Sequence, residues 1–140
     1  MKIKILEKYC YISYPIITII LIIILKLMSN YYNINIKLVD NFSETIVQIS
    51  GSLIGFLLTA ITIFLSFPKD TKIMQRFKKH KHHIIFSKCI FCGLFALIVS
   101  IFFWIFKSSN IYVFVSFIVG LEETLISARY IYKLVIYNFE

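Results

Sequence analysis

Apolar residues form four long runs along this chain, and polar residues gather between them. The runs cover residues 11–28, 45–67, 84–106 and 111–132. Each is close to the roughly 20 residues that an α-helix needs to cross the hydrocarbon core of a bilayer. The pattern therefore predicts one transmembrane domain, residues 1–140, with four membrane-spanning helices.

The composition supports this prediction. Hydrophobic residues make up 59% of the chain and aromatic residues 17%, which is not typical of a soluble domain. Four Gly and two Pro provide little turn material, so long helices are expected rather than the short strands of a membrane barrel. The predicted fold class is all-α. The short connector at 107–110 favours an antiparallel hairpin there, and the whole chain is expected to form two such hairpins.

The basic residues are distributed unevenly between the two predicted sides. Four spans place both termini on one side, together with the loop at 68–83, and that side holds 12 Lys and Arg residues against three on the other. By the positive-inside rule, the N- and C-termini are expected to be cytoplasmic, in a bacterial inner membrane. Most of the net charge of +8 then reflects topology and attraction to anionic lipid headgroups.

The loop at 68–83 carries most of this charge. Ile73, Met74 and Phe77 recur within it at helical spacing, which predicts a short amphipathic helix on the membrane surface. Expected ligands are anionic lipid or a cytosolic protein partner that binds at residues 68–88. No nucleic-acid ligand is expected, because Phe77 alone provides aromatic interleaving. The basic residues of the loop are Lys69, Lys72, Arg76, Lys78, Lys79 and Lys81.

The second apolar run carries a polar stripe. Its members are separated by alternate steps of four and three residues, so they lie on one face of a helix. They are Gln48, Ser52, Gly55, Thr59, Thr62 and Ser66. Gly51 and Gly55 also form a GxxxG spacing. Two interpretations stay open, a packing seam between helices or a wet path inside a homo-oligomer.

The fourth run contains two carboxylates near its middle, Glu122 and Glu123. A charged group at that depth is costly unless it faces protein or water. Arg129 lies seven residues beyond Glu122 and so on a similar face. A second polar stripe also follows this run, and two stripes predict that the second and fourth helices face each other or a shared lumen. The members of the second stripe are Ser116, Gly120, Glu123, Ser127 and Tyr130.

Three interpretations of the two glutamates remain. They could serve ion passage, proton sensing or gating. They could instead form a structural hydrogen bond to Thr59 or Gln48. In the third, the chain kinks near Gly120 and the fourth segment lies partly in the membrane interface, with its glutamates in water.

The remaining reactive residues do not predict a site. Cys89 and Cys92 form a CxxC pair, but on an apolar helix, without the strand context of a redox motif or the further ligands of a zinc site. His80, His82 and His83 are interpreted as part of the basic juxtamembrane face. No phosphate loop, nucleophile elbow or catalytic constellation is found in the sequence. We therefore expect no enzyme activity, no cofactor and no metal.

The polar-striped second helix, GSLIGFLLTAITIFLSFPKD, is followed by a basic connector and then a tight hairpin. This layout resembles the small four-helix membrane subunits of bacterial anti-phage systems, of the Kiwa membrane-component type. The resemblance implies a homo-oligomer that senses or alters the inner membrane during infection, with a cytosolic partner protein. It transfers no functional residue to this chain.

The leading hypothesis is an oligomeric pore-forming or membrane-sensing subunit, because a protomer of this size encloses no pore alone. One competitor is a holin-like or toxin-like permeabiliser that acts by itself. A second is a non-conducting membrane anchor or immunity-type protein. A small transporter is disfavoured by the lack of repeat symmetry.

Overall fold

The computed structural model of the protein describes residues 10–31, 41–66, 68, 72–79, 81–107 and 109–136. These residues form five helices and no strand, which confirms the all-α prediction. All the helices except α4 are long and apolar enough to cross a membrane, which indicates a multi-pass membrane protein. In chain order the helices are α2 (Cys10–Tyr31), α3 (Phe42–Ser66), α4 (Lys72–Lys79), α5 (His82–Ile105) and α6 (Asn110–Ile136).

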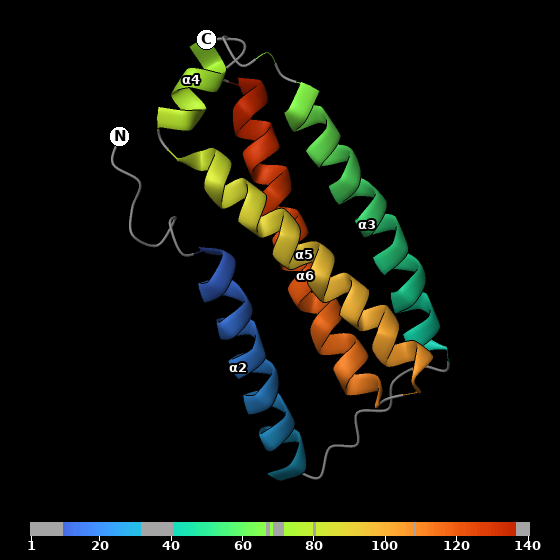
Figure 1. Ribbon diagram of the computed structural model, residues 1–140. Helices are drawn as coiled ribbons and strands as arrows, with labels where there is room; N and C mark the ends of the chain where they lie inside the picture. Colours follow the sequence, from blue (N-terminus) through green and yellow to red (C-terminus); the bar gives the residue numbers. More distant parts are fainter. Residues whose placement is uncertain are drawn as a thin grey trace.

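The antiparallel helices α5 and α6 form the centre of the structure (Figure 1). A short turn joins them. In it, the backbone N–H of Phe106 donates to the carbonyl of Phe102 at 3.0 Å, and that of Lys107 donates to the carbonyl of Trp104 at 2.9 Å. A connector this short makes the two helices it joins antiparallel neighbours.

The arrangement of the first two long helices differs from the expected hairpin. Helices α2 and α3 run in opposite directions but lie on opposite sides of the α5–α6 pair (Figure 1). Helix α2 packs on α6 and α5, and α3 packs on the same two helices. The physical reason is connector length. The sequence between Tyr31 and Asn41 is long enough that α2 and α3 need not pack on each other. The turn after α5 is too short to allow this.

Helices α5 and α6 approach each other closely because small residues line their contact. A Cβ atom at Gly120 of α6 would lie 2.5 Å from Cγ of Leu97 on α5, closer than packed atoms allow. The hydroxyl of Ser100 on α5 donates a hydrogen bond to the carbonyl of Val113 on α6, at 2.9 Å. Close backbone approach and interhelical hydrogen bonds are the interactions that hold helices together in lipid.

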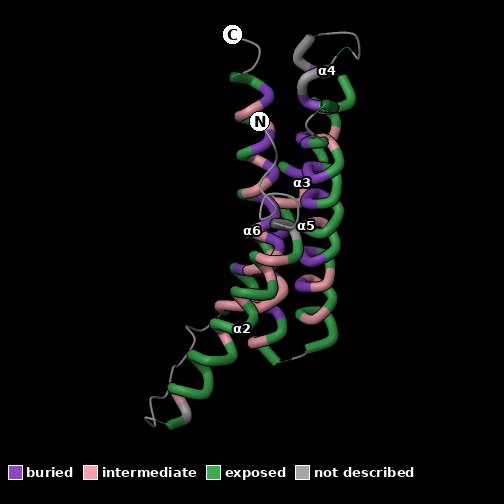
Figure 2. The backbone as a smooth tube through the Cα atoms, turned by 90° about the vertical axis from the view of Figure 1, so that its left-hand side faces the viewer, coloured by how far each residue is buried: buried purple, intermediate pink, exposed green. Residues whose placement is uncertain are grey.

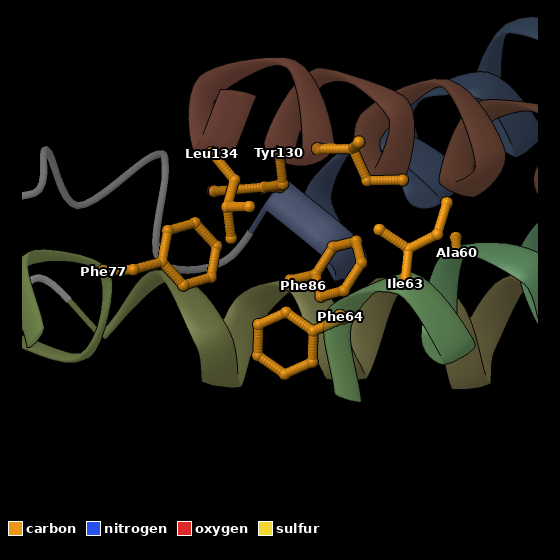
Figure 3. A pocket seen from close by; sticks show the side chains of 8 residues that line it. Ala60, Ile63, Phe64, Phe77, Phe86, Tyr130 and Leu134 are labelled. Atoms are coloured by element: carbon orange, nitrogen blue, oxygen red, sulfur yellow. The ribbon is translucent and has the colours of Figure 1, made fainter. Parts of the chain in front are cut away.

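Helix α4 packs its apolar face against the end of the bundle. Met74 and Phe77 are buried, and the Phe77 ring centre lies 5.9 Å from that of Phe64 and 5.6 Å from that of His82. The rings of Phe64, Phe77 and Phe86 are among the side chains that surround a small apolar cavity of about 10 Å³ (Figure 3). The predicted short amphipathic helix is therefore present, and its described apolar residues face the aromatic ends of α3, α5 and α6. Its place on the membrane surface stays a prediction.

Helix α2 is the least buried of the long helices. Most of its apolar side chains are exposed (Figure 2). Towards its C-terminal end it leans away from the bundle and passes beyond the turn between α5 and α6 (Figures 1 and 2). Its attachment to the bundle is therefore strongest in its N-terminal half.

Candidate functional site

Glu122 lies near the middle of α6 and faces α2. The hydroxyl of Thr18 on α2 donates a hydrogen bond to Oε1 of Glu122. The second carboxylate oxygen, Oε2, is buried and has no hydrogen-bond partner among the residues that the structure describes. A buried oxygen without a partner costs about 1–3 kcal/mol, and more if the group is charged. Glu122 is thus held at the α2–α6 contact while retaining the capacity to accept another bond.

Glu123 occupies a different environment, because adjacent residues on a helix point about 100° apart. It is fully buried where α3, α5 and α6 meet. A Cβ atom at Gly93 of α5 would lie 3.1 Å from Cβ of Glu123 and 3.1 Å from Cδ1 of Leu57 on α3. The absence of a side chain at Gly93 therefore makes room for this carboxyl group inside the three-helix core.

The hydrogen-bond partners considered for the glutamates from the sequence lie elsewhere. Gln48 and Thr59 are exposed on the outer side of α3. The Thr59 hydroxyl donates to the carbonyl of Gly55 in its own helix, at 2.9 Å. For Glu122, the donor is Thr18 of the first span. Thr18 was not among the predicted partners. The described part of α6 is also one continuous helix through Gly120, without the kink that the third interpretation required.

Glu122 and Arg129 line one cavity between α2 and α6. Its volume is about 280 Å³, and its other lining residues are Tyr14, Leu125 and Ile126. Seven residues on a helix correspond to a rise of about 10 Å. The carboxylate and the guanidinium group therefore lie at different depths of the same cavity, with Arg129 nearer the end of the bundle that α4 covers.

A larger groove lies on the other side of the contact between Thr18 and Glu122. Its volume is about 480 Å³, and α2, α5 and α6 enclose it, from Ile19 to Lys26 along α2. The lining is mostly apolar, and Lys26 is the one charged residue among the described residues that form it. The hydrogen bond between Thr18 and Glu122 thus separates two spaces along a single seam, the cavity that contains Glu122 and Arg129 and an apolar groove.

The stripe of α3 points away from the rest of the chain. All of its members are exposed, namely Gln48, Ser52, Gly55, Thr59, Thr62 and Ser66. The face that packs on α5 and α6 lies about half a turn away and contains Ile46, Ser50, Leu57 and Ala60. A Cβ atom at either Gly51 or Gly55 would meet nothing within 4 Å. The hydroxyl groups of the stripe donate to carbonyls one turn earlier in α3, as Ser66 does to Thr62 at 2.8 Å.

The stripe of α6, in contrast, faces inward. Gly120, Glu123, Ser127 and Tyr130 are buried, and Ser116 is half-buried. The second and fourth spans, α3 and α6, do contact each other, but the α3 stripe takes no part in that contact. The alternative, a shared lumen, stays a prediction. Helix α6 uses its stripe to approach α5, and α3 presents an apolar face to the bundle. The structure leaves the α3 stripe as an outer surface.

The basic residues of the predicted loop are described in part. Lys78, Lys79 and Lys81 are exposed at the end of the bundle that α4 covers. Lys72 and Arg76 belong to α4, and only their backbone is described. Lys69 lies outside the described residues, as does His80. The described lysines, together with Lys72 and Arg76 in the sequence of α4, make this end of the protein basic.

The histidines and cysteines of this end are separated by the fold. His82 is buried between the rings of Phe77 and Tyr130, at 5.6 and 5.5 Å between ring centres. Cys89 is buried and Cys92 is exposed. Within the described ranges, no group of three or more His, Cys, Asp or Glu residues could hold a metal ion.

Sequence reasoning missed three residues that shape the site. They are Thr18, which binds Glu122, and Gly93 and Ser100, which let α6 approach α5. A signal for the last two existed, since Gly93, Ala96 and Ser100 form a row of small residues with spacings of three and four. Thr18 gave no such signal, because it is one hydroxyl group in an isoleucine-rich run.

No protein-family model, no curated protein and no solved structure matches this chain. The geometry of the two sites, the seam between α2 and α6 and the outer stripe of α3, is therefore the basis for assigning a function.

Proposed function

We propose that the protein is a subunit of the bacterial inner membrane that assembles with copies of itself and forms a pore or senses the state of the membrane. The observation that carries this proposal is the outward orientation of the α3 stripe. Lipid chains gain nothing specific from a row of hydroxyl groups and glycines. A second helix gains close approach and hydrogen bonds, because the hydroxyl oxygens can still accept. Gly51 and Gly55 supply the flat surface that such approach requires.

The distribution of charge supports a defined orientation. Among the described basic residues, Lys26 and Lys107 belong to the end of the bundle with the α5–α6 turn. The others are at the end that α4 covers, namely Lys72, Arg76, Lys78, Lys79, Lys81, Lys88, Arg129 and Lys133. We therefore assign the α4 end to the cytoplasm. Both termini are cytoplasmic in this proposal.

The seam between α2 and α6 is the proposed responsive element. Helix α2 is exposed along most of its length, and the Thr18–Glu122 hydrogen bond is its described polar link to the bundle. A change in the membrane that moves α2 would break this bond and join the cavity that contains Glu122 and Arg129 to the groove beyond it. Glu122, Glu123 and Arg129 then set the polarity of the path or switch.

The basic surface around α4 provides a docking site for anionic lipid or for a cytosolic partner protein. Lys78, Lys79 and Lys81 are exposed there, and each Lys or Arg near an anionic surface contributes about 1 kcal/mol to membrane attraction. The resemblance of the layout to anti-phage membrane subunits supports a role in such a defence system.

The test is the membrane potential of cells that produce the chain alone. Wild type and the double variant Glu122→Gln/Glu123→Gln are compared at matched membrane levels, with Glu44→Gln, an exposed residue at the start of α3, as the control. Depolarisation by wild type and by the control, but not by the double variant, supports a conducting path. Depolarisation by all three indicates a permeabiliser that does not use these carboxylates. If none of the three depolarises and the double variant keeps full function in another assay, the non-conducting anchor is favoured.

A further inference from the structure

The apolar groove enclosed by α2, α5 and α6 has the length and position of one lipid leaflet. It extends along α5 from Phe95 to Phe103, a rise of about 12 Å, and along α2 from Ile19 to Lys26, a rise of about 10 Å. Half of a bilayer's hydrocarbon core is about 15 Å thick. The groove thus begins near the α5–α6 turn and ends near the middle of the membrane, at the Thr18–Glu122 contact.

The chemistry of the groove changes along its length in the same direction. Its inner part is lined by apolar side chains such as Val99 and Val119, and Lys26 and Tyr112 lie at its outer end. A lysine near the end of a membrane helix extends its ammonium group to the headgroup level, and a tyrosine hydroxyl is typical of the same level. A cation at the mouth of an apolar, leaflet-deep groove complements a phosphate group attached to an acyl chain.

We propose that this groove binds one acyl chain of an anionic phospholipid, with the headgroup phosphate near Lys26. Helix α2 diverges from the bundle on this side, and its lower part lies apart from α6 in both views (Figures 1 and 2). A volume of about 480 Å³ is within the range of about 300–1,000 Å³ in which proteins hold small ligands. A transmembrane helix of a second copy is about 10 Å wide or more and fits the groove less well than a single chain of methylene groups does. The site does not depend on self-association through α3.

The direct test is native mass spectrometry of the full-length protein after extraction from vesicles of equal parts phosphatidylcholine and phosphatidylglycerol. We expect wild type to retain one phospholipid, with phosphatidylglycerol in excess. Val99→Trp fills the groove and should lower retention about tenfold. Ile98→Trp, at an exposed neighbouring position of α5 that does not line the groove, is the matched control and should retain the lipid.

The headgroup contact is tested separately. Lys26→Gln should lower the preference for phosphatidylglycerol about fivefold, the change expected for one cation at a membrane surface. Lys107→Gln, an exposed lysine at the same end of the bundle, should leave the preference unchanged. Equal retention in the two tryptophan variants, or no lipid on wild type, overturns the proposal. A second copy of the chain retained in place of the lipid also overturns it.

A second measurement does not require the groove to be filled. In a Trp104→Phe background, Phe103→Trp places a reporter in the groove and Phe102→Trp places one on the exposed side of α5. Brominated phosphatidylglycerol should quench the groove reporter fully at a low fraction in the vesicle, and Lys26→Gln should raise that fraction about fivefold. The reporter at position 102 should follow the bulk fraction. Identical quenching of both reporters would refute a specific site.

Discussion

Thr18 of α2 donates a hydrogen bond to Glu122 of α6, and this contact divides the seam between the two helices into a cavity that contains Glu122 and Arg129 and an apolar groove. The bond joins residues more than a hundred positions apart in the sequence, in the first and last long helices. It also binds the most exposed helix of the protein to its core. The proposed switch depends on this bond being both specific and breakable.

Loss of the Thr18 hydroxyl should loosen α2. Thr18→Val keeps the shape of the side chain but leaves both oxygens of the Glu122 carboxylate without a described donor, a cost of about 1–3 kcal/mol. Hydrogen exchange of the α2 backbone amides in detergent should therefore accelerate. Thr18→Ser keeps the donor and serves as the control. Equal exchange rates in the Val and Ser variants would show that the bond does not hold α2.

Gly120 should tolerate no larger residue. Gly120→Ala places a Cβ atom 2.5 Å from Cγ of the buried Leu97, and overpacking of this kind costs about 1–3 kcal/mol. The temperature of thermal unfolding should fall. Gly55→Ala, in another helix, meets nothing within 4 Å and should unfold at or slightly above the wild-type temperature. A similar decrease in both variants would contradict this account, because helix propensity favours Ala at both positions and the decrease could not then be assigned to the α5–α6 contact.

The sequence predicted the helices of this fold better than it predicted which helices pack on each other. Each of the four apolar runs lies in a long helix, because about 20 consecutive apolar residues leave a chain few other structures in a membrane. The polar stripes were found, but their orientation was not. A row of small and hydroxyl residues shows that a helix face can be approached closely, and it does not identify the helix that approaches. On α6 that helix is α5, whereas on α3 none of the described helices approaches the stripe.

The packing of α4 on the bundle was not predicted, for a related reason. Its helical spacing of apolar residues was visible, but a membrane surface and the aromatic end of a bundle are equivalent partners for such a face. Phe64 of α3 and Tyr130 of α6 provide the apolar surface on which α4 packs, and they lie in two other helices. The hydrogen bond from Thr18 to Glu122 could not be predicted for the same reason. The connector between α2 and α3 is long, so the sequence does not determine which helices α2 packs against.

Phe77 should hold α4 on the bundle. Phe77→Ala removes a fully buried ring that contacts Phe64 and His82, and truncation of this size costs about 3–5 kcal/mol in a packed core. We expect proteases to cut between residues 68 and 81 faster in the variant, while α5 and α6 stay protected. Lys78→Ala, the exposed neighbour, should be cut at the wild-type rate. Unchanged cleavage of Phe77→Ala would refute the packing of α4.

Self-association through the outer stripe of α3 is the central claim, and thiol cross-linking in membranes tests it most directly. In a chain with Cys10, Cys89 and Cys92 replaced, Thr59→Cys places a thiol on the stripe. Leu58→Cys places one at the same depth, about 100° around the helix. The proposal predicts disulfide-linked dimers from Thr59→Cys at about ten times the yield from Leu58→Cys. Equal yields at the two positions, or no dimer from Thr59→Cys, would contradict it.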